Sequence, residues 1–161
     1  MDEDQLFFYY TANYQKDIIL RKKELYDGAQ PSANAMMCSN LFYLGQVFEP
    51  IDWTNQAAAM VSAMKKMILQ YPNSYSYWAQ CFSQMAVGMV ELVCVGENAL
   101  NGLNRVLSKF LPHHLILFTT KEEEVVLLTK GKQSIDNQYY ICQNKRCLAP
   151  IIELNEFLAN I

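Results

Sequence analysis

The run that divides this chain is Val-Glu-Leu-Val-Cys-Val-Gly over residues 90–96. A short, mostly apolar run that ends at a glycine is typical of a buried strand. Upstream of this run, apolar residues recur every three or four positions, as they do in helices. Downstream, further short apolar runs alternate with helical patterns. We therefore predict two regions, residues 1–89 and residues 90–161.

The downstream region is predicted to form a small α/β unit. After the strand at 90–95, we expect strands over residues 115–118 and 139–143. Helices are expected around residues 100–110, over 121–130 and over 152–161. Because strands and helices alternate in the order β-α-β-α-β-α, we predict three parallel strands with right-handed crossovers.

The upstream region is predicted to contain three helices, over residues 31–48, from Asp52 to Tyr71, and over residues 74–89. Each carries one apolar stripe, which in the first helix consists of Met37, Leu41, Leu44 and Phe48. Asp52 is a good N-cap for the second helix. Since the connections are short, we expect antiparallel helix hairpins.

A β-hairpin is predicted at the N-terminal end. Residues 6–11 (LFFYYT) and 18–22 (IILRK) are rich in aromatic and β-branched side chains, and a polar stretch separates them. Two such runs joined by a polar loop are typical of paired strands. The predicted fold class is therefore mixed: a hairpin, three antiparallel helices and a parallel α/β unit.

Composition excludes several classes of partner. The 161 residues include 13 basic and 16 acidic side chains, for a net charge of -3, and the longest basic block is Arg21-Lys22-Lys23. We therefore expect no binding to nucleic acid or to a membrane surface. An acidic N-terminus, no apolar run of roughly 18 residues and an odd number of cysteines, five, favour a cytoplasmic location. No glycine-rich fingerprint follows the first strand, so no cofactor is expected.

The turn from Tyr26 to Asn34 is the first candidate site. It gathers the acid Asp27, the hydroxyl of Ser32 and the amide of Asn34 around a helix N-terminus. Such groups can hold a polyol by paired hydrogen bonds. They can equally serve as caps for the first N–H groups of the helix. Both interpretations remain open on the residues alone, and no catalytic residue is assigned.

Cys142 and Cys147 form the second candidate site. They flank Gln-Asn-Lys-Arg, and the neighbouring Lys145 and Arg146 would favour a thiolate. The spacing is longer than in a helix-based redox pair, and zinc would need further ligands, for which only the distant His113 and His114 remain. No metal site is therefore predicted. We expect the two cysteines to be close enough to touch, to be mostly thiols in a reducing compartment and to act structurally, with a redox role as the alternative.

These motifs together resemble the C-terminal region of thioredoxin-domain proteins related to the spermatogenesis-associated thioredoxin-like protein. That family shows Asp-Gly-Ala-x-Pro-Ser-Gly-Asn at the start of a helix, and Ala33 stands here in place of its second glycine. Residues 6–11 resemble the family's upstream strand. The matching residues are Asp27, Gly28, Ala29, Pro31, Ser32 and Asn34 in the turn, and Tyr140, Ile141, Cys142, Cys147 and Pro150 downstream.

The resemblance implies a larger architecture. Family members carry a thioredoxin-like domain and then an α/α barrel similar to six-hairpin glycosidases and N-acylglucosamine epimerases, and this chain would correspond to about their last quarter. We therefore expect a non-catalytic C-terminal module, which self-associates or contacts the missing N-terminal part. The alternatives are a carbohydrate-active enzyme when joined to that part, with a sugar-like molecule at Asp27, Ser32 and Asn34, or a thiol redox module that uses Cys142 and Cys147.

Overall fold

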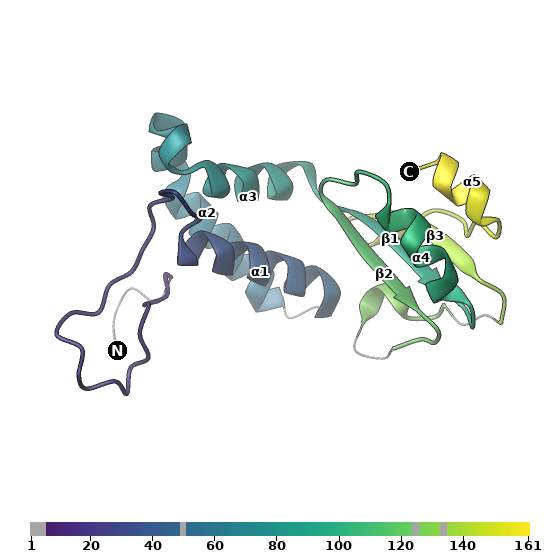
Figure 1. Cartoon of the computed structure of the whole chain (residues 1–161), viewed down its shortest axis with the longest axis horizontal. Helices are drawn as coiled ribbons and strands as arrows, with labels where there is room; N and C mark the ends of the chain where they lie inside the picture. The colour runs from purple at the N-terminus through teal and green to yellow at the C-terminus, as the bar shows by residue number, and fades with distance from the viewer. Residues whose placement is uncertain (1–5, 49–50, 124–125, 133–134) are drawn as a thin grey trace. The chain divides into compact units, whose positions relative to one another are not determined.

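The computed structural model describes residues 6–48, 51–123, 126–132 and 135–161, which divide into two compact units (Figure 1). Unit 1 comprises the described residues up to 46 and those from 51 to 86. Unit 2 comprises residues 47 and 48 and the described residues from 87 onward. None of the helices in these described ranges is long and apolar enough to cross a bilayer.

Unit 1 contains the three predicted helices, which are α1 (Ala33–Phe48), α2 (Ile51–Gln70) and α3 (Ser76–Val87). Their bounds differ slightly from the prediction. Asp52 lies inside the first turn of α2 rather than at its N-cap. The 3-10 turn η1 (Pro72–Ser74) precedes α3 because proline suits the first turn of a helix. The larger α/α barrel stays a prediction, since three helices alone do not form one.

The buried face of α1 shares only Leu41, which is 8% exposed, with the predicted stripe. Ala35, Cys38 and Phe42 are buried, whereas Met37 and Leu44 of the stripe are 37% and 41% exposed. Small residues at the contact allow close approach to α2: a Cβ on Gly45 would collide with the Thr54 hydroxyl. Larger apolar residues are therefore left on the outer face of α1. The core of unit 1 also contains Ala57, Met60, Val61, Met64 and Ile68 of α2 and Trp78 and Cys81 of α3.

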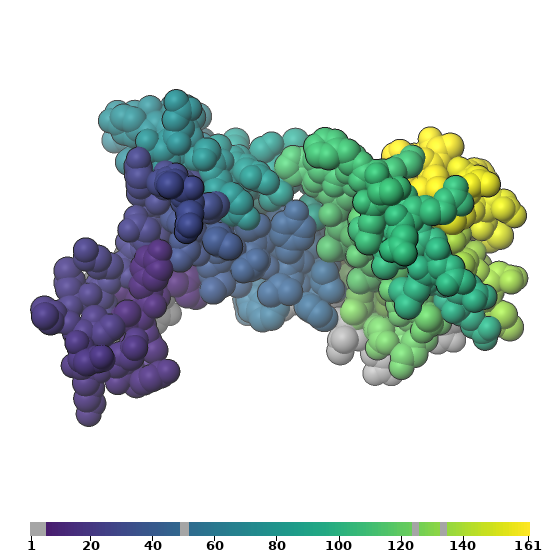
Figure 2. All heavy atoms as spheres, in the orientation of Figure 1, coloured from purple at the N-terminus to yellow at the C-terminus, as the bar shows by residue number. Residues whose placement is uncertain are grey.

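The predicted N-terminal β-hairpin is wrong, because the structure has no strand within residues 6–22. The Tyr10 N–H donates to the Lys22 carbonyl oxygen at 3.0 Å, but no ladder develops around this bond. Tyr14 and Ile19 are among the most exposed apolar side chains of the described chain. A two-stranded hairpin needs a further layer to cover its apolar face. The exposed side chains of this segment have no such cover, and the segment forms an irregular lobe of unit 1, purple in Figure 2.

Unit 2 is built on a four-stranded sheet in the order β2-β1-β3-β4. β1 and β2 are parallel, and α4 connects them, as predicted. The strands are β1 (Val90–Val95), β2 (His114–Thr119), β3 (Gln138–Gln143) and β4 (Arg146–Cys147), and the helices are α4 (Ala99–Leu107), α5 (Leu154–Ala159) and the 3-10 turn η2 (Leu127–Thr129). The predicted last helix is therefore confirmed in a shorter form.

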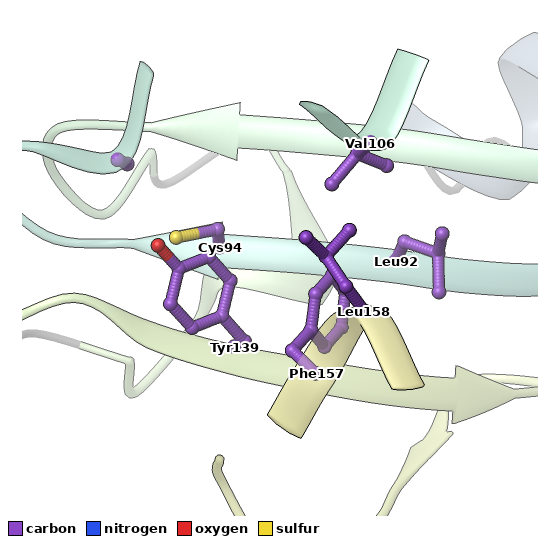
Figure 3. Packing of buried hydrophobic residues seen from close by; sticks show 7 residues of the cluster. Leu92, Cys94, Val106, Tyr139, Phe157 and Leu158 are labelled. Carbon is purple, nitrogen blue, oxygen red and sulfur yellow. The ribbon is translucent and has the colours of Figure 1, made fainter. Parts of the chain in front are cut away.

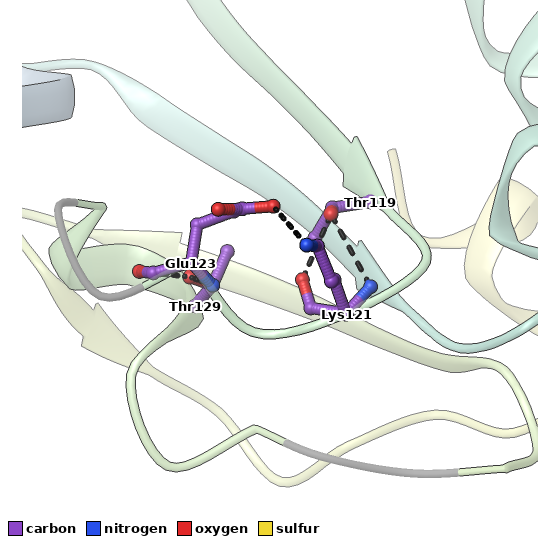
Figure 4. A network of polar contacts seen from close by, with 4 residues as sticks. All are labelled: Thr119, Lys121, Glu123 and Thr129. Atoms are coloured by element: carbon purple, nitrogen blue, oxygen red, sulfur yellow. Dashed lines mark hydrogen bonds and ion pairs between the residues drawn. The ribbon is translucent and has the colours of Figure 1, made fainter.

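The predicted all-parallel sheet is wrong, because β3 runs antiparallel to β1. A parallel β3 would need a crossover helix between it and β2. In the described part of residues 121–130 the chain forms only η2. The buried Thr129 hydroxyl accepts from the Glu123 N–H at 3.0 Å and lies 2.9 Å from the Val126 carbonyl oxygen. Figure 4 shows this compact turn beside Thr119 and Lys121, and it replaces the expected helix.

Both faces of the sheet are packed. On one face, α4 and α5 cover β1 and β3, as Figure 3 shows for Val106 and Phe157. The Phe157 ring stacks on Tyr139 with 5.0 Å between ring centroids. On the other face, Leu128 of η2 packs with Val93 and further core residues, namely Val95, Tyr140 and Cys142. Strand alternation therefore places Cys142 on the face opposite α4 and α5.

Candidate functional site

Asp27 is buried between the first residues of two helices. Its Oδ1 accepts from the Ser32 N–H at 2.8 Å, just before α1. Its Oδ2 accepts from the N–H groups of Tyr77 at 2.9 Å and Trp78 at 3.3 Å, in the first turn of α3. The Asp27 N–H donates to the Ser74 carbonyl oxygen at 3.0 Å. A carboxylate is well suited to this position, because helix N-termini offer unpaired donors and a positive dipole end.

Ser32 and Asn34 are also buried and bonded within the chain. The Ser32 Oγ accepts from the Ala35 N–H at 3.3 Å, which makes it a cap of α1. The Asn34 Oδ1 accepts from the Phe8 N–H at 2.7 Å. Its Nδ2 donates to the carbonyl oxygens of Phe8 at 3.0 Å and Glu24 at 2.9 Å. The structure thus brings Asp27 and Ser32 together, whereas Asn34 turns towards the N-terminal segment.

A small cavity of about 210 Å³ lies beside Asp27. Of the three motif residues that the sequence singled out, only Asp27 lines it. The remaining lining comes from the turn before α1 and from the start of α3: Gly28, Ala29, Gln30, Pro31, Ser76, Tyr77 and Gln80. The α3 residues were not predicted from the sequence, because they lie about 50 positions further along the chain and no local pattern couples the two segments.

The second candidate pair, Cys142 and Cys147, is joined by a disulfide. The two residues are direct cross-strand partners in β3 and β4, so the prediction that they would touch is confirmed. Asn144 and Lys145 make the connecting turn with φ values of 51° and 64°. Positive φ at both positions is typical of a tight two-residue hairpin. The cysteine side chains differ sharply in exposure: Cys142 is 1% exposed, whereas Cys147 lies on the surface.

A buried acid lies across from this disulfide. Glu91 in β1 is the direct cross-strand partner of Cys142 and is 1% exposed. Its Oε1 accepts from the Lys145 N–H at 3.4 Å, and its Oε2 has no hydrogen-bond partner within the described ranges. Burial raises the pKa of this carboxyl, while the Lys145 N–H and ammonium oppose the shift. Glu91 was not among the residues predicted from the sequence, although an acid inside an apolar strand is a recognisable signal.

A larger cavity, of about 710 Å³, is lined by the ends of β1, β3 and β4. Val90, Ile141 and Leu148 supply apolar surface, and Arg146 supplies a cation. Ile141 packs with the cluster that α4 and α5 cover, and Cys142 packs with the cluster on the opposite face. The cavity wall is therefore formed largely on the face away from the disulfide. The other lining residues are Cys142, Gln143 and Asn144.

Within the described ranges, no three His, Cys, Asp or Glu side chains are grouped so that they could hold a metal ion. His113 has a φ of 61°, and the His114 Nδ1 lies 2.7 Å from the Pro112 carbonyl oxygen. His114 is thus engaged at the connection between α4 and β2, far along the chain from the motif at Asp27.

Known proteins include distant relatives of this chain. The chain is 20% identical over 158 residues to spermatogenesis-associated protein 20 of Homo sapiens. It is 22% identical to the proteins of that name from Rattus norvegicus and Mus musculus. Each match covers 91% of this chain but 20% of the relative, so the chain spans about one fifth of the length of these relatives. No protein-family model matches the chain, and no solved structure matches it.

Proposed function

We propose that this chain is a non-catalytic interaction module, whose helical unit packs against further helices of a larger thioredoxin-linked, barrel-forming protein. The observation that carries this proposal is an apolar helix surface that unit 1 itself does not cover. The distant similarity supports it as well, since the chain matches about one fifth of each much longer relative.

The uncovered surface consists of residues that helical periodicity would assign to a core. Leu44 in α1 is 41% exposed, and Trp53 in α2 is 37% exposed. Phe82 in α3 is 45% exposed. Burying exposed apolar side chains against a partner releases about 25 cal/mol per Å² of apolar surface. A partner that supplies another apolar helix would gain this free energy.

A groove between α2 and α3 gives the surface a defined shape. It has a volume of about 330 Å³, which suits one or two apolar side chains of a neighbouring helix. Phe82 and Met85 form one wall, and Val61 lies on the other. Its remaining lining residues are Ala58, Ser62, Lys65 and Ala86. We expect a second copy of the chain to occupy this groove when no other helices are present.

The engagement of Asp27 within the fold supports a non-catalytic role. Its carboxylate accepts three backbone N–H groups, so loss of the charge would cost those bonds. A general acid or base must exchange its proton during the reaction, which conflicts with such a structural role. The carbohydrate chemistry of an epimerase or glycosidase would therefore need acid and base groups from outside this chain.

Light scattering over a concentration series tests the interaction proposal. We expect the chain to self-associate in the micromolar range, and Phe82→Ser to shift the equilibrium strongly towards monomer because it removes a wall of the groove. Leu69→Ser is the matched control: Leu69 is 72% exposed on α2 and does not line the groove. A monodisperse monomer at every concentration, or equal effects of both substitutions, would contradict the proposal.

The cavity beside Asp27 favours a second function, the binding of a sugar-like molecule. Asp27 Oδ1 accepts one N–H group, which leaves it capacity to accept a ligand hydroxyl. Gln80 lines the same cavity with an amide that can both donate and accept. We expect Gln80→Ala to weaken the binding of N-acylglucosamine in saturation-transfer NMR, with Gln70→Ala on exposed α2 surface as control. Absence of any saturation transfer to the intact chain would rule out this function.

A further inference from the structure

We infer that the Cys142–Cys147 disulfide is a thiol–disulfide exchange site and that Glu91 is the group that gives a proton to, and takes it from, the Cys142 sulfur. This inference does not depend on the interaction proposal, because all three residues belong to unit 2. It rests on the different exposure of the two cysteines, on the register of β1 with β3 and on the unpaired oxygen of a buried carboxyl.

The exposure of the cysteines determines which sulfur an incoming thiolate can reach. Cys147 lies in the two-residue edge strand β4 and is exposed, whereas Cys142 is 1% exposed. Thiol–disulfide exchange requires the attacking sulfur to approach one sulfur of the bond. The attack therefore falls on Cys147, and Cys142 is the leaving group. Lys145 and Arg146 directly precede Cys147, and their charges favour an anionic attacking thiolate.

The register of the sheet places a proton donor at the leaving group. Glu91 and Cys142 are paired residues of antiparallel strands, so their side chains lie on one face with Cβ atoms about 5 Å apart. β2 contributes the apolar Leu115 on the other side of Glu91. Lys145, in the hairpin turn, is the charged residue that acts on Glu91. The residue directly across the strands from a thiolate that forms at Cys142 is thus a carboxyl that can supply a proton.

The hydrogen bonding of Glu91 argues against a purely structural role. A buried carboxyl is normally retained with its oxygens paired, because an unpaired buried charge is costly. Oε1 has one long bond to the Lys145 N–H, and Oε2 has no partner within the described ranges. Burial also raises the pKa of Glu91, which increases the fraction that carries a proton near neutral pH. A protonated Oε2 can donate towards Cys142.

The reductive step balances as follows. The thiolate of an external thiol, such as glutathione, attacks the Cys147 sulfur and forms a mixed disulfide with it. The Cys142–Cys147 bond breaks, its electron pair passes to the Cys142 sulfur, and Glu91 protonates the resulting thiolate. A second external thiolate then attacks the external sulfur of the mixed disulfide. It forms the oxidised external disulfide and releases Cys147 as a thiolate, which takes a proton from water.

The reverse direction uses the same groups. Glu91, now a carboxylate, accepts the proton of the Cys142 thiol, and the Cys142 thiolate attacks the sulfur of Cys147 in the mixed disulfide. The internal bond re-forms, and the external thiolate leaves. The chain could therefore pass between the two states with glutathione and its disulfide as the only co-reactants.

The kinetics of reduction by glutathione across the neutral pH range test this assignment. We expect mass spectrometry of the trapped mixed disulfide to place glutathione on Cys147. We expect Glu91→Gln to slow reduction by about tenfold, with the largest effect at the acidic end of the range, because the variant has no proton to give. Glu91→Asp, which keeps a carboxyl, should recover part of the rate. Glu97→Gln, an exposed acid of the same unit, is the control and should leave the rate unchanged.

The inference is overturned if glutathione is trapped on Cys142, or if the rate and pH profile of reduction for Glu91→Gln match those of the original chain. Circular dichroism checks that each variant is folded. If Glu91→Gln does not fold, the unsubstituted chain still decides the matter. We compare the rate at which glutathione reduces the disulfide in the folded chain with the rate in the urea-unfolded chain. The ratio of the folded to the unfolded rate should rise as the pH falls, because only the folded chain places Glu91 beside Cys142. A ratio that is independent of pH would also overturn the inference.

Discussion

The carboxylate of Asp27 connects the two helix starts that meet in unit 1. It caps the start of α3, binds the turn before α1 and so links two segments that are distant in the sequence. Trp78, whose N–H it accepts, in turn donates from Nε1 to the Leu25 carbonyl oxygen at 2.8 Å. The turn that contains Asp27 therefore serves as a junction of the fold.

Asp27→Ala should destabilise unit 1 by about 3 kcal/mol, because it removes a cap and leaves buried N–H groups without an acceptor. Urea unfolding followed by tryptophan fluorescence measures the loss, since Trp78 lies at the junction. Asp17→Ala, an exposed acid of the same unit, should change stability by less than about 0.5 kcal/mol. Equal effects of the two substitutions would show that the capping bonds contribute little.

Cys94 should be unreactive as long as unit 2 stays folded. It is fully buried in β1, and burial raises the pKa of its thiol to about 12. Because the thiolate is the reactive form, its population becomes appreciable only when the pH approaches that value. We expect alkylation at mildly alkaline pH to be at least about a hundredfold slower than in the urea-unfolded chain. Rapid native labelling, read by mass spectrometry, would mean that the sheet opens frequently.

At the scale of elements, the packing of α1 on α2 depends on one close approach. A Cβ at Gly45 would collide with the Thr54 hydroxyl and would lie 3.2 Å from the Thr54 backbone nitrogen. The absence of a side chain there allows the helices to come together on the face of α1 that buries Ala35, Cys38 and Leu41, while Met37 and Leu44 of the predicted stripe stay exposed. Because α1 packs against α2 through this face, part of its apolar surface is left uncovered in unit 1.

Gly45→Ala should therefore destabilise the chain by about 2 kcal/mol, even though alanine is the better helix former. Adding Thr54→Ala should restore part of the loss, because the colliding hydroxyl is gone while the backbone nitrogen remains close. Thermal unfolding of both single variants and the double variant gives the coupling between the positions. A stabilised Gly45→Ala variant would mean that α1 and α2 separate at little cost.

At the scale of the whole molecule, the chain is two compact units rather than one core. Unit 2 carries its own apolar clusters on both faces of its sheet, with Leu92 and Phe157 on one side and Val93 and Leu128 on the other. A unit with a core of its own is expected to fold without its neighbour.

A fragment of residues 87–161 should thus fold alone. We expect hydrogen exchange in this fragment to protect the amides of the central strand β1 to nearly the same extent as in the intact chain, because β1 is paired on both sides within the unit. The intact chain is the reference. A fragment with unprotected β1 amides would show that unit 1 is needed to complete the second core.

Local sequence determined most elements of this protein but not their assembly. Helical periodicity and proline positions predicted α1, α2 and α3, and apolar runs predicted β1 and β2, because these signals act over one or two turns of chain. The direction of β3 depends instead on whether a crossover helix forms, and the compact turn around Thr129 replaces it. Strand β4 arises from a turn with positive φ at Asn144 and Lys145, a conformation for which the sequence carries only a weak signal.

For the candidate sites as well, the sequence determined some features and the tertiary structure determined the others. The sequence alone identified Asp27, Ser32, Asn34, Cys142 and Cys147 as unusual, because polar and thiol groups clustered within a few residues. Only the tertiary structure decided that Asp27 binds the start of α3, and that Glu91 lies opposite Cys142. The physical reason is that hydrogen-bond partners and burial depend on groups about 50 positions away, which are brought together by packing and strand register rather than by local conformation.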